Sequence, residues 1–488
     1  MFVTSALLVS ALAGLVVLVA LFRLRSSSSP SSTKSVALVV LGDIGRSPRM
    51  LYHASSFASY GYRTHIVAYR GSAPLKELAD NPNVHFVYLP TPLGWISSFP
   101  RPLFLLFAPF KVVFGAFDLL CALVWTLDAP PAYLFLQNPP AIPTLPVVKL
   151  ASLLRGSRVI IDWHNTGYSV LALRLGEQHP VVRLAKGIEH FFGRSAYAHL
   201  CVSDAMKAQL QKEANLRGNV VTLHDRPPSS FRRQSPEEAQ ELFDRLPLFS
   251  TLAFPSPVSS TPFHPLSPAS DRPALLVSAT SWTADEDFSI LLRALELYEE
   301  AARAHEAGEG GLPRKKVDEE GGKDRLPRVV VVITGKGAGK EAFEREVQEL
   351  EKGWEWVRVR TAWLAREDYP RLLGSADLGI SLHTSTSGID LPMKVVDMFG
   401  CGLPALALDF PCLDELVKHD QNGRVFRSPE DLADQLISLL RNHPRPFPSD
   451  LDRLRAGIRQ ASYGGGEGES WGSWDENWDR VVGPLLGL

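Results

Sequence analysis

Short apolar runs alternate with polar loops and amphipathic stretches along most of the chain. The run VALVVL at 36–41 is apolar without alternation, which is typical of a parallel strand buried on both faces. A polar loop at 42–48, a helical pattern at 49–60 and a strand pattern at 64–69 follow. Strand-then-loop patterns recur at 132–138, 157–165, 197–203 and 219–227. This order predicts a doubly wound parallel sheet.

A second series of the same kind begins at residue 274. Strands and their loops are expected at 274–282, 328–341, 356–364, 377–385 and 403–410, with a helix over 288–298. The sequence therefore predicts an α/β protein of two Rossmann-like domains that face a cleft. We place these domains at 36–254 and 274–462, a Pro/Ser-rich linker at 255–273, a mobile charged insertion at 305–327, and a C-terminal helix within 463–488.

The first residues have a different composition. Residues 1–22 carry no charged side chain, and about 20 such residues cross a hydrocarbon core. Arg23 and Arg25 follow at once, and positive flanks stay on the cytoplasmic side. We expect a transmembrane anchor at 1–22 and a stalk at 23–35. A cleaved signal peptide is the alternative, but its charges would precede a shorter apolar run.

Composition agrees with a globular body in the cytoplasm. Hydrophobic residues make up 45% and charged residues 21% of the 488 residues, and the formal net charge of −2 argues against nucleic acid as a partner. The chain has no Asn-x-Ser/Thr acceptor. Its cysteines form no CxxC pair and are expected to be reduced: Cys121, Cys201, Cys401 and Cys412.

The segment 99–127 is very apolar and is interrupted by prolines. Two interpretations stay open. It forms a buried helix pair of the first domain, or it lies in a membrane surface.

In the stretch 384–404, a turn rich in hydroxyl residues precedes a short helix. The backbone N–H groups and dipole of a helix N-terminus suit an anion. Lys394 and Asp397 are three residues apart and share one face of this helix. An exposed ion pair between them is the alternative, and it would contribute little. We favour a nucleoside diphosphate site, in which Lys394 holds the phosphates and Asp397 the ribose hydroxyls, with turn contacts from Ser385, Ser387 and Gly388.

A glycine loop follows the strand at 329–334. Gly335 and Gly337 would let a phosphate approach the backbone, and Lys336 supplies positive charge. The spacing is not that of a P-loop, and a plain strand-to-helix turn is the alternative.

An acidic triplet at 285–287 resembles a metal site. Thr283 and Glu286, however, have the spacing of a capping box, which we favour. The neighbouring loop residues Ser281 and Trp282 are better ligand candidates.

Polar loops also end the strands of the first domain, where ligands of such sheets bind. Asp43 and His164 both follow strands, and either side chain could act as a base toward a hydroxyl of a bound substrate. We rank Asp43 first because a carboxylate is the commoner base, and His164 second. The alternative for Asp43 is that it caps the next helix, although Ser47 could do so instead. The further contacts expected for this substrate, which is the acceptor under the family resemblance described next, are Gly42, Gly45, Arg46, Asn165 and Arg226.

Several stretches between residues 36 and 426 jointly resemble a known family. They read LGDIGRSPRM, IDWHNTGYS, CVSDAMK, HDRPP, TSWTADEDFSILL, ITGKG and SGIDLPMKVVDMFGCGLP. The chain resembles glycosyltransferases of the two-Rossmann GT-B type, and within them the eukaryotic β-mannosyltransferases of the dolichol pathway. Related enzymes often hold the donor with two glutamates eight apart. Here Asp397 matches the second, and Ile389 stands in place of the first.

The resemblance implies an inverting transfer of mannose from GDP-mannose to GlcNAc₂-diphosphate-dolichol, at the cytoplasmic face of the endoplasmic reticulum. It implies no obligatory metal, and a divalent cation such as Mg²⁺ stays open. The expected partners are the two substrates and the membrane, with self-association or other mannosyltransferases of the pathway as further ones. A non-catalytic partner of another transferase, and a sugar-nucleotide epimerase, are the alternatives.

Overall fold

The computed structural model describes residues 34–91, 101–250, 252, 254, 263, 272–282, 286–308, 325–384, 388–444, 449–463 and 473–488. The predicted anchor and nearly all of the stalk lie outside these residues. Within them, no helix is both long and apolar enough to cross a membrane. The chain divides into two compact units. Unit 1 consists of the residues up to His224 together with the C-terminal segment Trp478–Leu488, and unit 2 consists of Asp225–Asn477.

The boundary between the units lies earlier than the predicted domain end. Residues 225–254 belong to unit 2, so Arg226 is part of the second unit and not of the expected acceptor domain. Each unit contains one parallel sheet, as predicted from the apolar runs.

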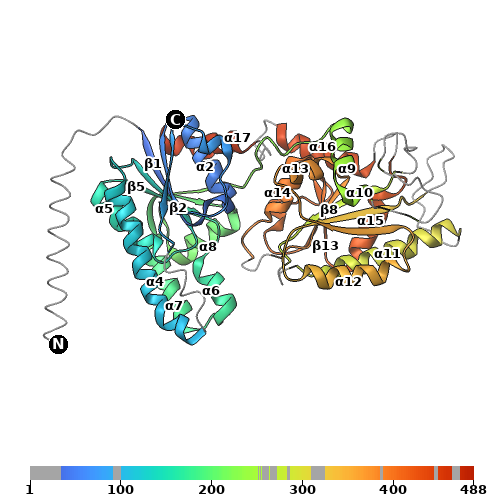
Figure 1. The fold of residues 1–488 in the computed structure, drawn as a ribbon, viewed down its shortest axis with the longest axis horizontal. Coiled ribbons are helices and arrows are strands. Elements are labelled where there is room, and N and C mark those ends of the chain that lie inside the picture. Colours follow the sequence, from blue (N-terminus) through green and yellow to red (C-terminus); the bar gives the residue numbers. More distant parts are fainter. Residues whose placement is uncertain are drawn as a thin grey trace. The chain divides into compact units, whose positions relative to one another are not determined.

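Unit 1 is built on a seven-stranded sheet in the order β3-β2-β1-β4-β5-β6-β7 (Figure 1). The strands are β1 Ser35–Asp43, β2 Arg63–Tyr69, β3 Val84–Leu89, β4 Tyr133–Asn138, β5 Arg158–Trp163, β6 Ser195–Cys201 and β7 Arg217–Thr222. The helices are α2 Pro48–Ser59, α3 Lys76–Ala79, α4 Arg101–Cys121, α5 Thr144–Arg155, α6 Gly167–Leu175, α7 Pro180–Gly193, α8 Asp204–Ala214 and α18 Gly483–Leu486. Helix α17, Trp474–Val481, belongs to unit 1 from Trp478 on. The order of the strands reverses between β1 and β4, where ligands of such sheets bind.

Unit 2 is built on a six-stranded parallel sheet in the order β10-β9-β8-β11-β12-β13. The strands are β8 Ala274–Ala279, β9 Val329–Thr334, β10 Val357–Ala362, β11 Leu378–Ser381, β12 Ala405–Leu408 and β13 Gly423–Phe426. The helices are α9 Pro236–Arg245, α10 Pro247–Ser250, α11 Phe288–Glu306, α12 Lys340–Glu351, α13 Asp368–Ser375, α14 Met393–Gly400, α15 Pro429–Leu440 and α16 Asp450–Tyr463. The edge strands β3 and β13 of the two sheets are not predicted from the sequence pattern.

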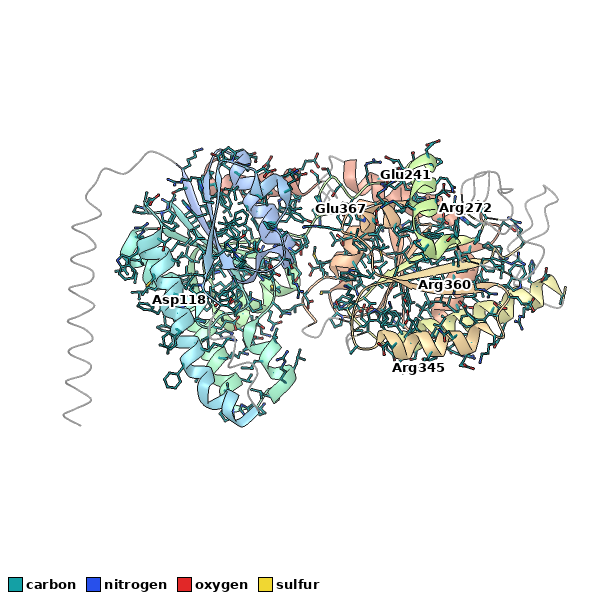
Figure 2. All side chains as sticks on the ribbon, in the orientation of Figure 1. Asp118, Glu241, Arg272, Arg345, Arg360 and Glu367 are labelled. Atoms are coloured by element: carbon teal, nitrogen blue, oxygen red, sulfur yellow. The ribbon has the colours of Figure 1, made fainter. Side chains whose placement is uncertain are left out.

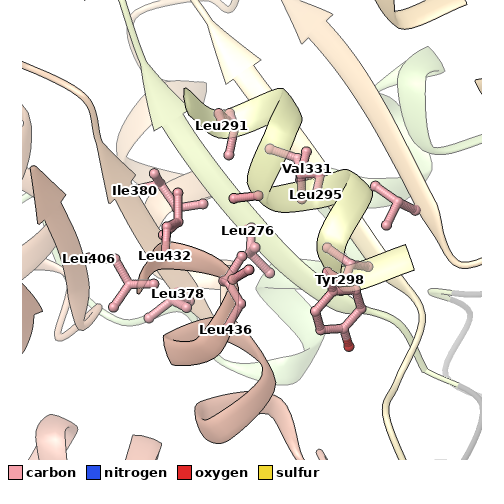
Figure 3. Packing of buried hydrophobic residues seen from close by; sticks show 14 of the residues in the cluster. Leu276, Leu291, Leu295, Tyr298, Val331, Leu378, Ile380, Leu406, Leu432 and Leu436 are labelled. Carbon is pink, nitrogen blue, oxygen red and sulfur yellow. The ribbon is translucent and has the colours of Figure 1, made fainter. Parts of the chain in front are cut away.

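Two helices bury apolar stripes against the sheet of unit 2 (Figure 3). On α11, Leu291, Leu295 and Tyr298 follow helical spacing and are fully buried, and α15 packs beside it. The Tyr298 hydroxyl donates to the Pro327 carbonyl at 2.8 Å, so this buried group keeps a partner. Leu326 is also buried in this core. The predicted insertion at 305–327 is therefore wrong at both of its ends: α11 continues to Glu306, and residues 326–327 pack into the core.

Charged side chains lie over the surface of unit 2, among them Arg272 and Arg360 (Figure 2). Arg272 reaches the buried carboxylate of Asp377 at 3.5 Å, and the Leu275 N–H donates to the same carboxylate at 3.0 Å. Burial would raise the pKa of Asp377, but Arg272 and His443 outweigh it and hold the pKa below its ordinary value. This carboxylate ties the start of β8 to the start of β11. Within the predicted linker, Phe263 is buried and packs against Phe243 and Phe249 of unit 2.

The segment expected to form a buried helix pair or a membrane-surface helix forms one helix, α4, and a π-helical turn, Ala122–Thr126. Phe110, Val113, Phe114 and Phe117 are exposed along α4, so the buried-pair interpretation is wrong. At the other end of the chain, Trp478 of α17 is fully buried in unit 1. Its ring lies 5.3 Å from Phe57 of α2, centroid to centroid.

Candidate functional site

A buried carboxylate organises the carboxyl end of β5 in unit 1. Arg49 of α2 donates to Asp162 through two parallel hydrogen bonds, from Nε to Oδ2 and from Nη2 to Oδ1, each 2.9 Å long. The Asp162 side chain has no exposed surface, and that of Arg49 is 5% exposed. Burial would raise the pKa of Asp162, but Arg49 and the neighbouring histidines outweigh it and hold the pKa well below its ordinary value. Asp162 is therefore a fixed negative charge.

Two histidines lie against the Asp162 carboxylate. The Nε2 atoms of His164 and His53 lie 2.7 Å and 3.3 Å from Asp162 Oδ2. His53 Nδ1 accepts a hydrogen bond from the Trp478 indole N–H at 3.0 Å, which leaves the His53 proton on Nε2, facing the carboxylate. Burial lowers the pKa of His53 to about 4. His53 is thus a neutral, buried imidazole whose Nε2–H faces the Asp162 carboxylate.

His164 differs from His53 in that it reaches the surface. Its side chain is 23% exposed, because it follows the last residue of β5. Asp162 binds Nε2 and so favours the tautomer with the proton on that atom. In the described part of the chain, Nδ1 has no hydrogen-bond partner, and its lone pair is available to accept a proton from a substrate.

Asp43, the first-ranked base candidate, is occupied by hydrogen bonds. Its carboxylate accepts from the Gly45 N–H at 3.0 Å, and from the N–H and hydroxyl of Ser72 at 2.9 and 2.8 Å. Burial works to raise the pKa of Asp43, but these donors and Arg46 outweigh it and lower the pKa. Asp43 caps the 3₁₀ turn at 44–46, whereas Ser47 makes no cap. This geometry favours His164 over Asp43 as a proton acceptor.

The expected acceptor contacts differ in their surroundings. Gly45 permits a close approach of two loops, because a Cβ there would come within 2.7 Å of the Ser72 carbonyl. The side chain of Arg46 is 82% exposed, while Asn165 accepts from the Thr166 N–H at the start of α6. Gly42 lies within β1. Arg226 is 2% exposed and belongs to unit 2, two residues after the boundary at His224.

Glu189 of α7 completes this region and is not among the site residues predicted from the sequence. Its carboxylate accepts from the Gly167 N–H at 2.9 Å, the Tyr168 N–H at 3.0 Å and the Asn138 amide at 2.7 Å. Burial raises the pKa of Glu189, although these three donors oppose the shift. An acid within the apolar run GIEHFF is the signal that could have drawn attention to it. It fixes the N-terminus of α6 beside the His164 loop.

In unit 2, Lys394 pairs with a carboxylate far away in sequence. Its ammonium forms an ion pair with Glu286, whose side chain is 2% exposed, and Glu286 also accepts from the Thr280 hydroxyl. Lys394 lies in the first turn of α14, which follows the N-cap Pro392. The exposed pair of Lys394 with Asp397 is therefore not formed, and the buried pair replaces it.

The predicted capping box at 283–286 is wrong. Asp287 is the N-cap of α11 and accepts from the Ser289 N–H at 2.9 Å, so Glu286 is free to pair with Lys394. Thr283 and Asp285 lie outside the described residues. The ring of Trp282, expected to meet a ligand, is packed in the core 4.9 Å from Phe288, whereas Ser281 is exposed.

The glycine loop after β9 packs against the loop after β8. Gly335 has φ +147°, and a Cβ there would lie 1.8 Å from the Thr280 carbonyl, so only glycine fits. Gly337 makes a similar approach to the Ser281 carbonyl. Lys336 is exposed and lies 4.2 Å from the centroid of the Trp363 ring, which follows β10. These loops follow neighbouring parallel strands and therefore lie together at the carboxyl ends of the strands.

Asp397 lies one turn after Lys394 and accepts from the Tyr369 hydroxyl at 3.3 Å. Burial, with a contribution from Asp225, raises the pKa of Asp397 to about 7. A carboxyl group that is part-protonated near neutral pH can both donate to and accept from a pair of hydroxyls. Gly388, with φ +71°, lies in the turn before α14, while Ser385 and Ser387 lie outside the described residues.

Two family models match the chain. Residues 45–226 match "Glycosyl transferase 4-like domain" and residues 315–442 match "Glycosyl transferases group 1". Among solved structures, Anabaena HepE with UDP and glucose gives a TM-score of 0.57 at 15% identity, covering 93% of this chain and 100% of that one. Sucrose-phosphate synthase from Thermosynechococcus elongatus gives 0.58 at 12% identity, covering 93% and 98%. The chain is a glycosyltransferase of the GT-B fold.

The curated relatives narrow the class. Chitobiosyldiphosphodolichol beta-mannosyltransferase of Mus musculus is 42% identical, covering 99% of this chain and 94% of the relative. Its Homo sapiens counterpart is 42% identical, covering 93% of each. The Arabidopsis thaliana protein named UDP-glycosyltransferase TURAN is 40% identical, covering 92% of this chain and 96% of the relative. The chain belongs to the chitobiosyldiphosphodolichol beta-mannosyltransferase family.

Proposed function

We propose that this protein transfers mannose from GDP-mannose to the distal GlcNAc of GlcNAc₂-diphosphate-dolichol, forming a β-1,4 linkage. The observation that carries the proposal is the 42% identity, over nearly the whole chain, to relatives that bear the name of this activity. The polar strand ends of both units, and the ion pair at the start of α14, are consistent with an acceptor and a donor site.

In the proposed reaction the acceptor hydroxyl attacks the anomeric carbon of mannose while the bond from that carbon to the phosphate oxygen breaks. The donor is α-linked and the product β-linked, so a single displacement inverts the centre and needs no covalent enzyme intermediate. The hydroxyl proton passes to His164 Nδ1, and Asp162 stabilises the imidazolium that forms. GDP leaves with the bonding electron pair.

The leaving diphosphate needs positive charge near it. We assign this role to Lys394, with the N-terminus of α14 and Lys336 in support. Glu286 holds Lys394 in the described structure, and an incoming diphosphate would compete with this carboxylate. We assign the ribose hydroxyls to Asp397. No protein-bound metal is required in this scheme, and transfer in the presence of a chelator tests the alternative that Mg²⁺ is needed.

We further propose that residues 1–22 anchor the protein in the endoplasmic reticulum membrane and that the body faces the cytoplasm. This rests on the uncharged run and the arginines that follow it. Protease added to intact microsomes should digest the body, and full protection of the body would exclude this topology.

The experiment for the activity is transfer by the purified full chain from a panel of sugar nucleotides to lipid-linked chitobiose. The panel includes UDP-glucose and UDP-N-acetylglucosamine, because one relative is named a UDP-glycosyltransferase. Transfer of β-linked mannose from GDP-mannose supports the proposal. Loss of all transfer in the purified protein would favour a non-catalytic partner, and interconversion of the donor without transfer would favour an epimerase.

A further inference from the structure

Unit 1 has a concentration of exposed apolar side chains. Among the described residues, all exposed large apolar side chains but Tyr60, Trp363, Met393 and Leu488 lie between residues 110 and 191. That range holds α4, α5, α6 and α7. Because α4 and α7 both pack against α5, and α6 packs against α7, these helices form one contiguous group (Figure 1).

The exposed side chains form stripes along these helices. On α4 the stripe is Phe110, Val113, Phe114 and Phe117, at the spacing of one helix face, and Phe117 is 61% exposed. The inward residues Gly115 and Leu119 of the same helix are buried. A helix at the surface of a globular protein usually turns only one apolar face, toward the core. α4 has a second apolar face, on the side of the helix opposite its buried residues.

α7 has the same two-sided pattern. Val181, Leu184 and Phe191 are exposed on its outer side, with Leu184 at 64%, while Val182 and Glu189 are buried on the inner side. On α6, Val170 and Leu173 are exposed and three residues apart. On α5, Leu153 is 80% exposed. Patches of this kind mark interaction surfaces.

Positive charge flanks the apolar stripes. Arg174, Arg183 and Arg194 are exposed on or next to α6 and α7, and the Arg194 guanidinium lies 5.4 Å from the centroid of the Phe191 ring. Of the acids in α6, α7 and the turn between them, Glu189 is buried and only Glu177 is exposed. An apolar face with a basic border complements the acyl chains and anionic head groups of a membrane surface.

We propose that the outward face of α4, α5, α6 and α7 docks unit 1 onto a bilayer surface that contains anionic phospholipid. This use of the face is separate from any anchor at 1–22, since it involves the folded body of the protein. It rests on the proposed function only in that a dolichol-linked acceptor is held in a membrane.

The docking face is attached to the candidate acceptor site by the chain itself and by hydrogen bonds. α6 begins two residues after Asn165, and Glu189 of α7 accepts from the backbone N–H groups of Gly167 and Tyr168. The loop that carries His164 therefore stays fixed to α6 and α7. Docking of these helices would hold that loop near the membrane surface, where the diphosphate of a lipid-linked acceptor lies.

The test uses the full chain and a photoactivatable phospholipid whose acyl chain carries a diazirine. The protein is mixed with vesicles of phosphatidylcholine, with or without phosphatidylserine, and irradiated, and labelled peptides are mapped by mass spectrometry. We expect label on residues 110–117 of α4 and on Leu153, with more label when phosphatidylserine is present and less at high salt.

Substitutions on one part of the face should reduce the label on another. Leu173→Glu/Leu184→Glu/Phe191→Glu changes only exposed positions of α6 and α7. It should lower the label on residues 110–117 about tenfold. Loss of one buried leucine side chain from an apolar environment already weakens binding by about this factor. Leu184→Glu alone is compared with Leu488→Glu, which adds the same charge at an exposed leucine of unit 1 outside the face and should leave the label unchanged.

Three results would overturn the proposal. One is label confined to residues outside 110–191. Another is label on the face that the triple variant does not reduce. The third is cross-linking of two copies through α4 and α7 without lipid label, which would make the face a self-association surface. Mannose transfer to a short-chain, water-soluble acceptor is measured on the same preparations. Its failure would count against the proposed function and leave the labelling result intact.

Discussion

Replacement of Arg49 by methionine is the most informative perturbation of unit 1. Methionine has a similar length and no charge, so it fills much of the space and removes both hydrogen bonds that Arg49 donates to Asp162. The substitution also removes the bond from Nη1 to the Leu223 carbonyl, which is 2.9 Å long. The carboxylate of Asp162 then stays buried beside His53 and His164.

The magnitude follows from the burial of the pair. Loss of one member of a buried ion pair leaves an uncompensated charge, which costs about 3–5 kcal/mol of unfolding free energy. Both side chains are almost fully buried, so solvent screening does not reduce this cost. An exposed pair would change stability by about 0–1 kcal/mol. The two expectations are well separated.

The cost should depend on pH. Arg49 contributes to the low pKa of His53, so its removal should raise that pKa above about 4. In the wild-type fold the low pKa of His53 costs stability as pH falls below the ordinary histidine pKa, and a higher His53 pKa in the variant reduces this cost. The loss of unfolding free energy in Arg49→Met should therefore be largest at pH 8 and smaller at pH 5, where a protonated His53 compensates the charge of Asp162.

Hydrogen exchange of the β1 and β5 amides measures this stability for unit 1 alone, which matters in a protein of two units. The matched control is Arg49→Met/Asp162→Asn, which removes both charges and should recover most of the lost protection. A deficit below about 1 kcal/mol at pH 8 would refute the reasoning. So would a double variant no more stable than the single one.

Three further predictions concern the candidate site. His164→Gln should lower kcat by about a hundredfold or more and leave GDP-mannose binding intact, whereas Asp43→Asn should do so less; the reverse order, measured by steady-state kinetics and donor titration, would restore Asp43 as the base. Lys394→Met should weaken GDP-mannose binding sharply in calorimetry while Glu286→Gln should weaken it less or strengthen it, and equal losses would make the pair a structural bridge only. Because the pKa of Asp397 is raised to about 7, its protonated form stabilises the fold below the ordinary pKa, and this stability is lost as pH rises through about 7. Asp397→Asn should accordingly melt higher than wild type at pH 8 and alike near pH 4, and a lower melting temperature at both values would contradict the raised pKa.

The sheets were predictable because their strands are buried on both faces. Continuous apolar runs such as those at 36–41 and 329–334 have no amphipathic alternative, and each became a strand at the expected place. The edge strand Val84–Leu89 is half-buried at most of its positions and lacks that signal. The end of α11 was also missed, because helical residues with charged side chains resemble an insertion in composition.

The site was only partly predictable, since its partners are far apart in sequence. Lys394 was expected to meet a phosphate, but its ion pair with Glu286 joins positions separated by 108 residues, and local spacing made Glu286 resemble a cap. The hydrogen bonds from Ser72 to Asp43 join two loops, and the sequence does not reveal which loops meet. His164 was identified by its position, while Arg49, His53 and Asp162 become a set only through tertiary packing.

The central claim is that this chain is a β-mannosyltransferase that uses GDP-mannose. The most direct measurement is transfer by the purified full chain from GDP-mannose, with UDP-glucose and UDP-N-acetylglucosamine as competing donors, to diphosphate-linked chitobiose on a lipid carrier. The product is analysed by mass spectrometry and by digestion with β-mannosidase. The account predicts one added mannose that β-mannosidase removes. A product formed only from a UDP-sugar, or a mannose that resists β-mannosidase and yields to α-mannosidase, would contradict it.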